Sequence, residues 1–213
     1  MAQTKFTSLA DAVFEQLEND ILTGVYKRGD ILTENELSVA LNVSRTPVRE
    51  AIRRLEQENL IKELSKGHEV IGITKEDIMD IYDVRLLIEG KAARLCAENI
   101  SNEEIEEMRE VIDLQEFYTQ KNVADKIKVT DSLFHDLIYK CTGSAIYQSI
   151  LSSLHRKIQL CRKVSVSNSG RAEQAVKEHR ELFKAIESKN ADLAEKLMIE
   201  HIKNAKESIK GLK

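Results

Sequence analysis

The sequence predicts a mostly α-helical protein with two domains. Aromatic residues make up 5% of the 213-residue chain, Trp is absent, and 8 Gly and 1 Pro are present, which favours helices over sheet. Apolar residues recur at helical spacing through most of the chain. A capping motif after Ile73 marks a new start, so we place the first domain at residues 1–73 and the second at 74–213.

The first domain opens with an amphipathic helix over residues 9–22, which ends near Gly24. Thr33 and Glu36 have the spacing of a capping box and predict a second, short helix. Its expected inward residues are Leu37, Ala40 and Leu41. Residues 42–43 form the turn into the next helix.

The third helix begins at Ser44, whose hydroxyl is suited to accept an N-capping hydrogen bond. Pro47 falls in the first turn, where no intrahelical donor is lost. The expected buried stripe of this third helix is Val48, Ala51, Ile52 and Leu55. Arg45, Arg49 and Arg53 step by four and share another face. Cations on a helix anchored by its opposite side suit a DNA groove.

A β-hairpin should follow, with strands at residues 60–63 and 68–73 and a turn at Ser65, Lys66 and Gly67. The order of helix, turn, arginine-bearing helix and hairpin predicts an N-terminal winged helix-turn-helix that binds DNA. The alternative is a three-helix bundle with a solvated arginine face, which leaves this order unexplained.

The charge of the chain is unusual for a DNA-binding protein. The formal net charge is −4, and residues 1–74 hold nine basic and twelve acidic residues, so 9 − 12 = −3. Affinity must therefore come from local clustering, at Arg45, Arg49, Arg53, Arg54 and Lys66. We expect salt-dependent binding that is weak on random DNA, with base contacts supplying discrimination.

Two motifs support this interpretation at the residue level. They are Leu32-Thr33-Glu34-Asn35-Glu36-Leu37 and Val43-Ser44-Arg45-Thr46-Pro47-Val48-Arg49-Glu50-Ala51-Ile52-Arg53-Arg54-Leu55. With them, residues 8–73 resemble the winged-helix domain of the GntR family of bacterial transcriptional regulators; Asn35 departs from the arginine that many relatives carry. The resemblance implies that Arg45 and Arg49 reach base edges and that Thr46 contacts phosphate. The remaining predicted DNA contacts are Arg53, Lys66, Gly67 and His68, although an exposed loop position is the commoner role for such a histidine.

The second domain is expected to form an antiparallel all-helical bundle. Six helices are predicted, at about 75–99, 102–120, 123–141, 145–164, 171–188 and 191–209. Ser101 and Glu104 form a capping box, and Gly143 and Gly170 mark two breaks between helices.

Four polar side chains interrupt the inward stripes of this bundle. His179 and His201 each sit in the middle of an apolar stripe, and Asp131 and His135 lie one turn apart beside another. Burying four such groups is unfavourable unless they are paired. Each histidine could be a hydrogen-bonded core residue. A single divalent cation would satisfy all four, and three imidazoles with one carboxylate suit Zn²⁺, Ni²⁺ or Mn²⁺.

Residues 75–210 resemble the ligand-sensing FCD domain of the FadR-like branch of the same family. The markers are Asp131-x-x-Phe134-His135, Glu178-His179 with Ile186 and Ala191 beyond, and His201. The resemblance implies that Asp131, His135, His179 and His201 are metal ligands and that open coordination positions take water or a small carboxylate metabolite. It also implies that Ser144, where relatives often carry Asn, borders the effector pocket.

Arg85 and Glu89 form a second inward pair, one turn apart. A buried salt bridge is the favoured interpretation, and binding of an effector carboxylate by Arg85 is the alternative. His155 lies just off its stripe and is expected to be structural or at most pocket-lining.

The remaining features suit a cytoplasmic protein with reduced thiols. Cys96, Cys141 and Cys161 are widely spaced on or beside apolar stripes. No apolar run approaches the roughly 18 residues that span a membrane, and the N-terminus lacks a signal-peptide core.

The resemblance further implies that the helical domains dimerise and place two winged helices on a short palindromic operator, and that the chain is a repressor like most relatives. We therefore predict a homodimeric, metabolite-responsive transcriptional regulator. The alternatives are a regulator for which the metal ion is the signal, and a metal-dependent hydrolase.

Overall fold

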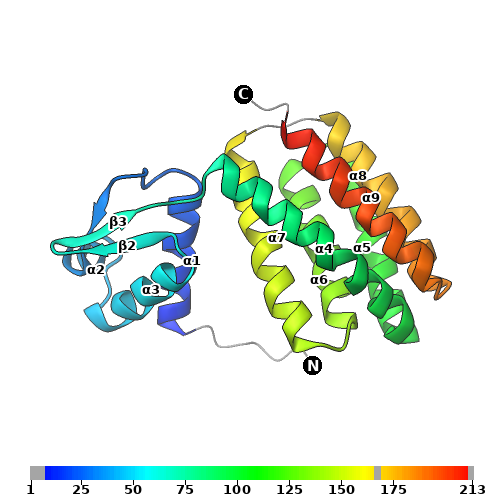
Figure 1. The fold of residues 1–213 in the computed structure, drawn as a ribbon, viewed down its shortest axis with the longest axis horizontal. Helices are drawn as coiled ribbons and strands as arrows, with labels where there is room; N and C mark the ends of the chain where they lie inside the picture. Colours follow the sequence, from blue (N-terminus) through cyan, green and yellow to red (C-terminus); the bar gives the residue numbers. More distant parts are fainter. Residues whose placement is uncertain (1–7, 166–168, 211–213) are drawn as a thin grey trace. The chain divides into compact units, whose positions relative to one another are not determined.

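The structure, a computed structural model, describes residues 8–165 and 169–210 and divides the chain into two compact units, Met1–Lys75 and Glu76–Lys213 (Figure 1). The first unit contains three helices and a small sheet, and the second is all helical within the described residues. The predicted mostly α-helical fold is therefore confirmed.

The three helices of the first unit are α1 (Leu9–Leu22), α2 (Glu34–Ala40) and α3 (Arg45–Gln57). Helix α1 packs on α3, where the Arg54 guanidinium lies 3.9 Å from the centroid of the Phe14 ring. Thr33 caps α2 by accepting a 3.3 Å bond from the Glu36 N–H. Of the predicted inward residues of α2, Leu37 is buried and Leu41 half-buried, but Ala40 is exposed, because a helix of two turns covers the core with only one side.

The sheet has the order β1-β3-β2 and is antiparallel throughout, with β1 (Ile31–Leu32), β2 (Ile61–Leu64) and β3 (Gly67–Val70). The two wing strands were predicted, whereas β1 was not, since two residues carry no periodicity. Gly67 pairs with Leu64 as the first residue of β3 rather than lying in the turn. A Cβ at Gly67 would stand 2.7 Å from the Leu32 carbonyl oxygen, and its φ of +126° disfavours other residues.

The second unit is a bundle of antiparallel neighbours. Its helices are α4 (Lys75–Asn99), α5 (Asn102–Gln120), α6 (Ala124–Cys141), α7 (Ala145–Ser165), α8 (Ser169–Glu187) and α9 (Ala191–Lys210). The ends agree with the predicted ranges to within two residues. None of the helices in the described ranges combines the length and hydropathy needed to cross a membrane.

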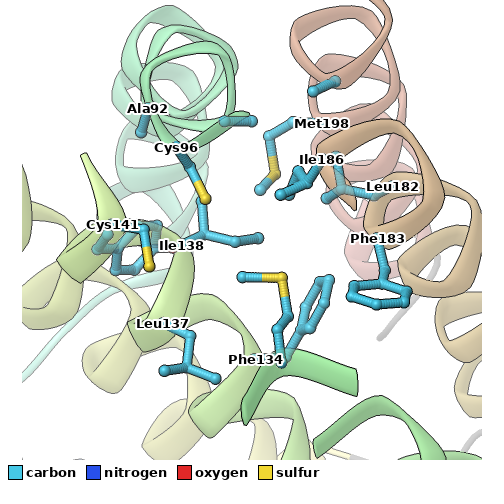
Figure 2. Packing of buried hydrophobic residues seen from close by; sticks show 14 of the residues in the cluster. Ala92, Cys96, Phe134, Leu137, Ile138, Cys141, Leu182, Phe183, Ile186 and Met198 are labelled. Carbon is cyan, nitrogen blue, oxygen red and sulfur yellow. The ribbon is translucent and has the colours of Figure 1, made fainter. Parts of the chain in front are cut away.

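The apolar core of the bundle draws on all six helices, and Figure 2 labels the part that α4, α6, α8 and α9 contribute. Cys96 from α4 and Cys141 from α6 are buried there as free thiols, as expected, whereas Cys161 is half-buried rather than buried and forms no disulfide within the described residues. Helix α4 approaches α9 closely at Gly90, where a Cβ would lie 2.7 Å from Ile199 Cγ1. A larger residue at this position would therefore require the half-buried Ile199 side chain to move.

Candidate metal centre and DNA-contacting surface

Helix α3 displays the predicted arginines on its outer side. Arg45, Thr46, Arg49 and Arg53 are exposed. The opposite side is buried, at Pro47, Val48, Ala51, Ile52 and Leu55. Ser44 occupies the N-cap with extended backbone, but its side chain makes no capping hydrogen bond, so the expected role of its hydroxyl is wrong. The turn before it uses Asn42 at a φ of 52°, a conformation that asparagine tolerates.

Arg49 is held by an acidic residue of the preceding helix. Its Nε donates to Glu34 Oε1 and its Nη2 to Glu34 Oε2, both at 2.9 Å. The hydrogen bond from Arg49 is the main cause that lowers the pKa of the Glu34 carboxyl. The pair uses the side edge of the guanidinium, so three of its five N–H groups remain for another acceptor.

The predicted DNA-contacting residues of the wing differ in their exposure. Lys66 is exposed at the hairpin turn, and Gly67 begins β3. His68 is half-buried, with Nδ1 3.1 Å from Glu56 Oε1 of α3. The expectation of an exposed loop histidine is therefore wrong, because His68 is a strand residue that joins the wing to α3.

Three histidines from three helices meet inside the bundle. His135 of α6, His179 of α8 and His201 of α9 are 1%, 0% and 5% exposed, as their places on the apolar stripes predict. One ring nitrogen of each lies within 4.8 Å of the others. The Nε2 atoms of His179 and His201 are 3.3 Å apart. Two nitrogen ligands of one tetrahedral ion, each bound at about 2.1 Å, lie at a similar distance from each other.

Hydrogen bonds orient these rings. His179 Nδ1 lies 2.9 Å from Gln115 Oε1, and His201 Nδ1 lies 2.7 Å from Glu178 Oε2. Amide and carboxylate oxygens accept, so each bond places the imidazole proton on Nδ1. The two Nε2 atoms then face each other as lone pairs, a repulsive arrangement that a cation between them would relieve.

The ring of His135 has longer polar contacts than the other two. Its Nδ1 lies 3.3 Å from the Tyr139 hydroxyl and 3.6 Å from Glu89 Oε2, which is buried. The Tyr139 hydroxyl can donate or accept, and Glu89 Oε2 receives no hydrogen bond from the described residues, so these contacts are compatible with either tautomer of His135.

The Asp131 carboxylate lies beside the three-histidine cluster and is not within 4.8 Å of all three of its ligand atoms. Oδ1 lies 4.0 Å from His179 Nε2, whereas Oδ2 lies 3.5 Å from His155 Nε2 and accepts from the Gln159 amide. His155 of α7 is 4% exposed, so it belongs to the site more fully than its sequence position indicated. Asp131, His135 and His155 also offer ligand atoms within 4.8 Å of one another.

The charge states of these groups favour cation binding. Burial lowers the pKa of His179 well below its ordinary value and that of His201 to about 4. Burial alone would raise the pKa of Asp131, but the hydrogen bond from His155 helps to hold it well below the usual range. Neutral imidazoles beside an ionised carboxylate are the forms that bind a divalent metal. The donor set and its orientation therefore fit a divalent cation.

The two predicted effector residues lie in different places. Arg85 is buried on α4 in an ion pair with Glu89, as favoured from the sequence. Ser144 lies in the turn between α6 and α7, where its N–H donates to Thr142 Oγ1 at 3.1 Å. That turn follows the end of α6, roughly 9 Å along the helix axis from His135. Arg85 adjoins the histidine cluster, and Ser144 does not.

Several partners of the cluster were not predicted from the sequence. Gln115 interrupts the apolar stripe of Met108 and Ile112, a signal that could have been noticed. Gln159 follows His155 by one helical turn, but nothing local shows that both face Asp131. Such contacts between distant helices appear only in the fold.

Comparison with known proteins defines the class of this chain. The family model described as "Bacterial regulatory proteins, gntR family" matches residues 9–67, and the FCD domain model matches residues 80–204. With its exposed arginine helix, the chain is a DNA-binding transcriptional regulator. It belongs to the GntR family and carries an FCD domain.

Individual relatives agree. An uncharacterized HTH-type transcriptional regulator, YdhC of Bacillus subtilis (strain 168), is 27% identical over 203 residues, covering 92% of this chain and 89% of YdhC. The gluconate operon transcriptional repressor of Bacillus licheniformis is 28% identical over 203 residues, covering 92% of this chain and 83% of the repressor. The solved structure of E. coli McbR/YncC shares the fold, with a TM-score of 0.77 at 22% identity over 93% of this chain and 95% of that one. YdhC and the gluconate operon repressor are named as transcriptional regulators, which agrees with the class that the two family models define for this chain.

Proposed function

We propose that this chain is a homodimeric repressor whose helical bundle binds one divalent metal ion and a small carboxylate effector. The observation that carries the proposal is the pair of facing Nε2 lone pairs of His179 and His201, 3.3 Å apart in a buried site. His135 and Asp131 supply the other donors. The ion, Zn²⁺, Ni²⁺ or Mn²⁺, would offer its remaining coordination positions to the effector.

Metal binding is tested on the purified full chain by elemental analysis and calorimetry. We expect about one ion per chain and a lower melting temperature after chelation, since an ion that binds only the native state stabilises it. His179→Ala should abolish high-affinity binding, whereas His68→Ala, in the other unit, should not. A wild-type chain that binds none of the three ions would exclude the metal site.

A hydroxy acid is the first effector to test. The relative from Bacillus licheniformis is named for the gluconate operon, and gluconate combines a carboxylate with hydroxyl groups that suit an open metal site. Gluconate and other small carboxylates should be titrated into the metal-loaded protein and then into its operator complex. The effector proposal fails if every carboxylate that binds leaves operator affinity unchanged, because a ligand shifts an equilibrium only by differential binding.

Arg85 and Ser144 are the proposed effector-linked residues. Arg85→Met with an unchanged effector response would reject a role for this guanidinium in sensing. Ser144→Asn, which installs the residue common in relatives, should change effector preference and not metal affinity. Equal preference in the two proteins would remove Ser144 from the effector site.

DNA recognition is proposed to use Arg45, Thr46, Arg49 and Arg53 of α3 with Lys66, Gly67 and His68 of the wing. Arg49→Ala should weaken operator binding about ten- to a hundredfold, since a bidentate arginine–guanine contact is lost. Arg28→Ala, in the loop after α1, is the matched control and should bind nearly as the wild type. Normal operator binding by Arg49→Ala would refute the assignment of α3.

The homodimer is supported by apolar side chains that the single chain leaves uncovered. Leu87 of α4 is 81% exposed and Ile146 of α7 is 69% exposed, with Val84 and Ile150 nearby in sequence at 43% and 47%. Large exposed apolar side chains at helical spacing are typical of an interface. A dimer would also present two winged helices to a palindrome.

A second candidate function is a regulator for which the ion itself is the signal. It is favoured by the burial of the three-histidine cluster, which is complete without any organic ligand. Operator binding titrated with free metal, with and without carboxylates, separates the two. A response to metal alone at physiological concentrations would establish the second function.

A further inference from the structure

His155 lies in a chain of polar contacts that joins three helices. Its Nδ1 is 3.4 Å from Arg85 Nη2 of α4, and its Nε2 is 3.5 Å from Asp131 Oδ2 of α6. Its ring centroid is only 4.5 Å from that of His135. By distance alone, His155 is as good a candidate ligand as the other three histidines.

The hydrogen-bond chemistry separates His155 from them. A guanidinium only donates, so the Nδ1 atom that faces Arg85 must be the unprotonated nitrogen. A neutral imidazole that accepts at Nδ1 carries its single proton on Nε2. That N–H faces Asp131 Oδ2, which only accepts, and the Gln159 amide nitrogen, 3.3 Å from the same Nε2, donates to this oxygen as well.

His179 and His201 have the opposite tautomer. In His179 and His201, acceptors at Nδ1 hold the proton there and leave Nε2 free. A metal ligand needs a free lone pair directed at the ion. His155 directs an N–H into the site and has its lone pair occupied by Arg85.

We propose that His155 is a positioning residue for Asp131 and not a metal ligand. Together with the Gln159 amide it holds Oδ2, so that Oδ1, the oxygen nearer His179 Nε2, is the one offered to the ion. Arg85 selects the tautomer that makes this possible. The inference rests on the proposed metal site and adds a polar connection from α4 through α7 to the ligand on α6.

The first test reads the tautomers directly and needs no metal. Nitrogen-15 imidazole spectra of the metal-free protein should place the proton of His155 on Nε2 and those of His179 and His201 on Nδ1. A proton on Nδ1 of His155 would overturn the proposal. This result is independent of whether the wild type binds an ion, so its failure is distinguishable from failure of the proposed function.

The second test compares two substitutions of His155. Gln places an amide N–H near the position of Nε2, whereas Leu removes the donor. We expect His155→Leu to weaken metal binding about ten- to a hundredfold, as is usual for partners of metal ligands, and His155→Gln to stay within about threefold of the wild type. Equal losses in the two variants would contradict a positioning role.

X-ray absorption of the metal-loaded proteins counts the bound imidazoles. Three are expected in the wild type, His155→Leu and His155→Gln, and two in His135→Gln. Four imidazoles in the wild type, falling to three in both His155 variants, would show that His155 is a ligand.

The role of Arg85 is tested in the variant Arg85→Met/Glu89→Gln, which removes both buried charges together and keeps an oxygen facing His135. Its metal affinity should fall about as much as that of His155→Leu, relative to Glu89→Gln alone. Loss of Arg85 and loss of His155 interrupt the same connection to Asp131. Adding His155→Leu to the double variant should therefore reduce metal affinity little further. Circular dichroism confirms folding of each variant, and fully additive losses would refute the connection.

Discussion

Replacing Glu34 by Gln tests whether the contact with Arg49 prepares α3 for DNA. Glu34 accepts two bonds from one edge of the guanidinium, each at 2.9 Å. The opposite end of that guanidinium is the part that binds the O6 and N7 atoms of guanine in a bidentate contact. The substitution keeps the shape of the side chain and removes the charge that strengthens both bonds.

Two effects of Glu34→Gln work in opposite directions. A released Arg49 must be ordered when it binds a base, and ordering one long side chain corresponds to about a two- to tenfold loss of operator affinity. Loss of a carboxylate near the phosphates strengthens binding to every sequence. The second effect acts on both affinities, so the ratio of operator affinity to random-sequence affinity should fall about two- to tenfold.

Fluorescence anisotropy with an in vitro selected operator and a scrambled duplex, at several salt concentrations, measures this ratio. Glu50→Gln is the matched control, because Glu50 is an exposed carboxylate on α3 itself. It should change both affinities by a similar factor. The reasoning is refuted if Glu34→Gln leaves the ratio unchanged, or if Glu50→Gln lowers it equally.

Three other outcomes are expected. Burial lowers the pKa of His155 and His201 to about 4, against about 6.5 in an unfolded chain. The unfolded state therefore binds more protons than the folded state between these pH values. As the pH falls from about 6.5 to 4, the metal-free protein should lose up to about 1.4 kcal/mol of stability per pH unit for each histidine. A urea midpoint that increases as the pH falls would contradict this. Gly90→Ala should destabilise the bundle by about 1–3 kcal/mol, despite the higher helix propensity of Ala. Gly170→Ala, where a Cβ would have no neighbour within 4 Å, should not be destabilised. Equal melting temperatures for Gly90→Ala and the wild type would exclude the close approach. Leu87→Asp should shift the protein from dimer to monomer in analytical ultracentrifugation, and an unchanged dimer would move the interface off α4.

Features set by local residues were predictable from the sequence. Helix α5 begins at Asn102 because Ser101 and Glu104 form the capping box that their spacing indicates. Burial of His135, His179 and His201 followed from their places in a 3.6-residue period. These histidines meet because their helices pack in one bundle, which the apolar stripes also predicted.

Features set by distant residues were not predictable in this way. Glu34 and Arg49 are 15 residues apart, and Arg85 and His155 are 70 apart, so neither contact has a periodic signal. The tautomer of His155 depends on which partner faces each ring nitrogen. That information exists only once α4, α6 and α7 are packed together.

The close approach at Gly67 has a consequence for mutational genetics. Any side chain there would push against the Leu32 carbonyl, and Thr33, the cap of α2, is the very next residue. A substitution of Gly67 would thus displace β1 and, through Thr33, the start of α2, the helix that carries Glu34. In a screen for derepressed colonies such an allele would resemble a lost DNA contact, although its defect is one of folding.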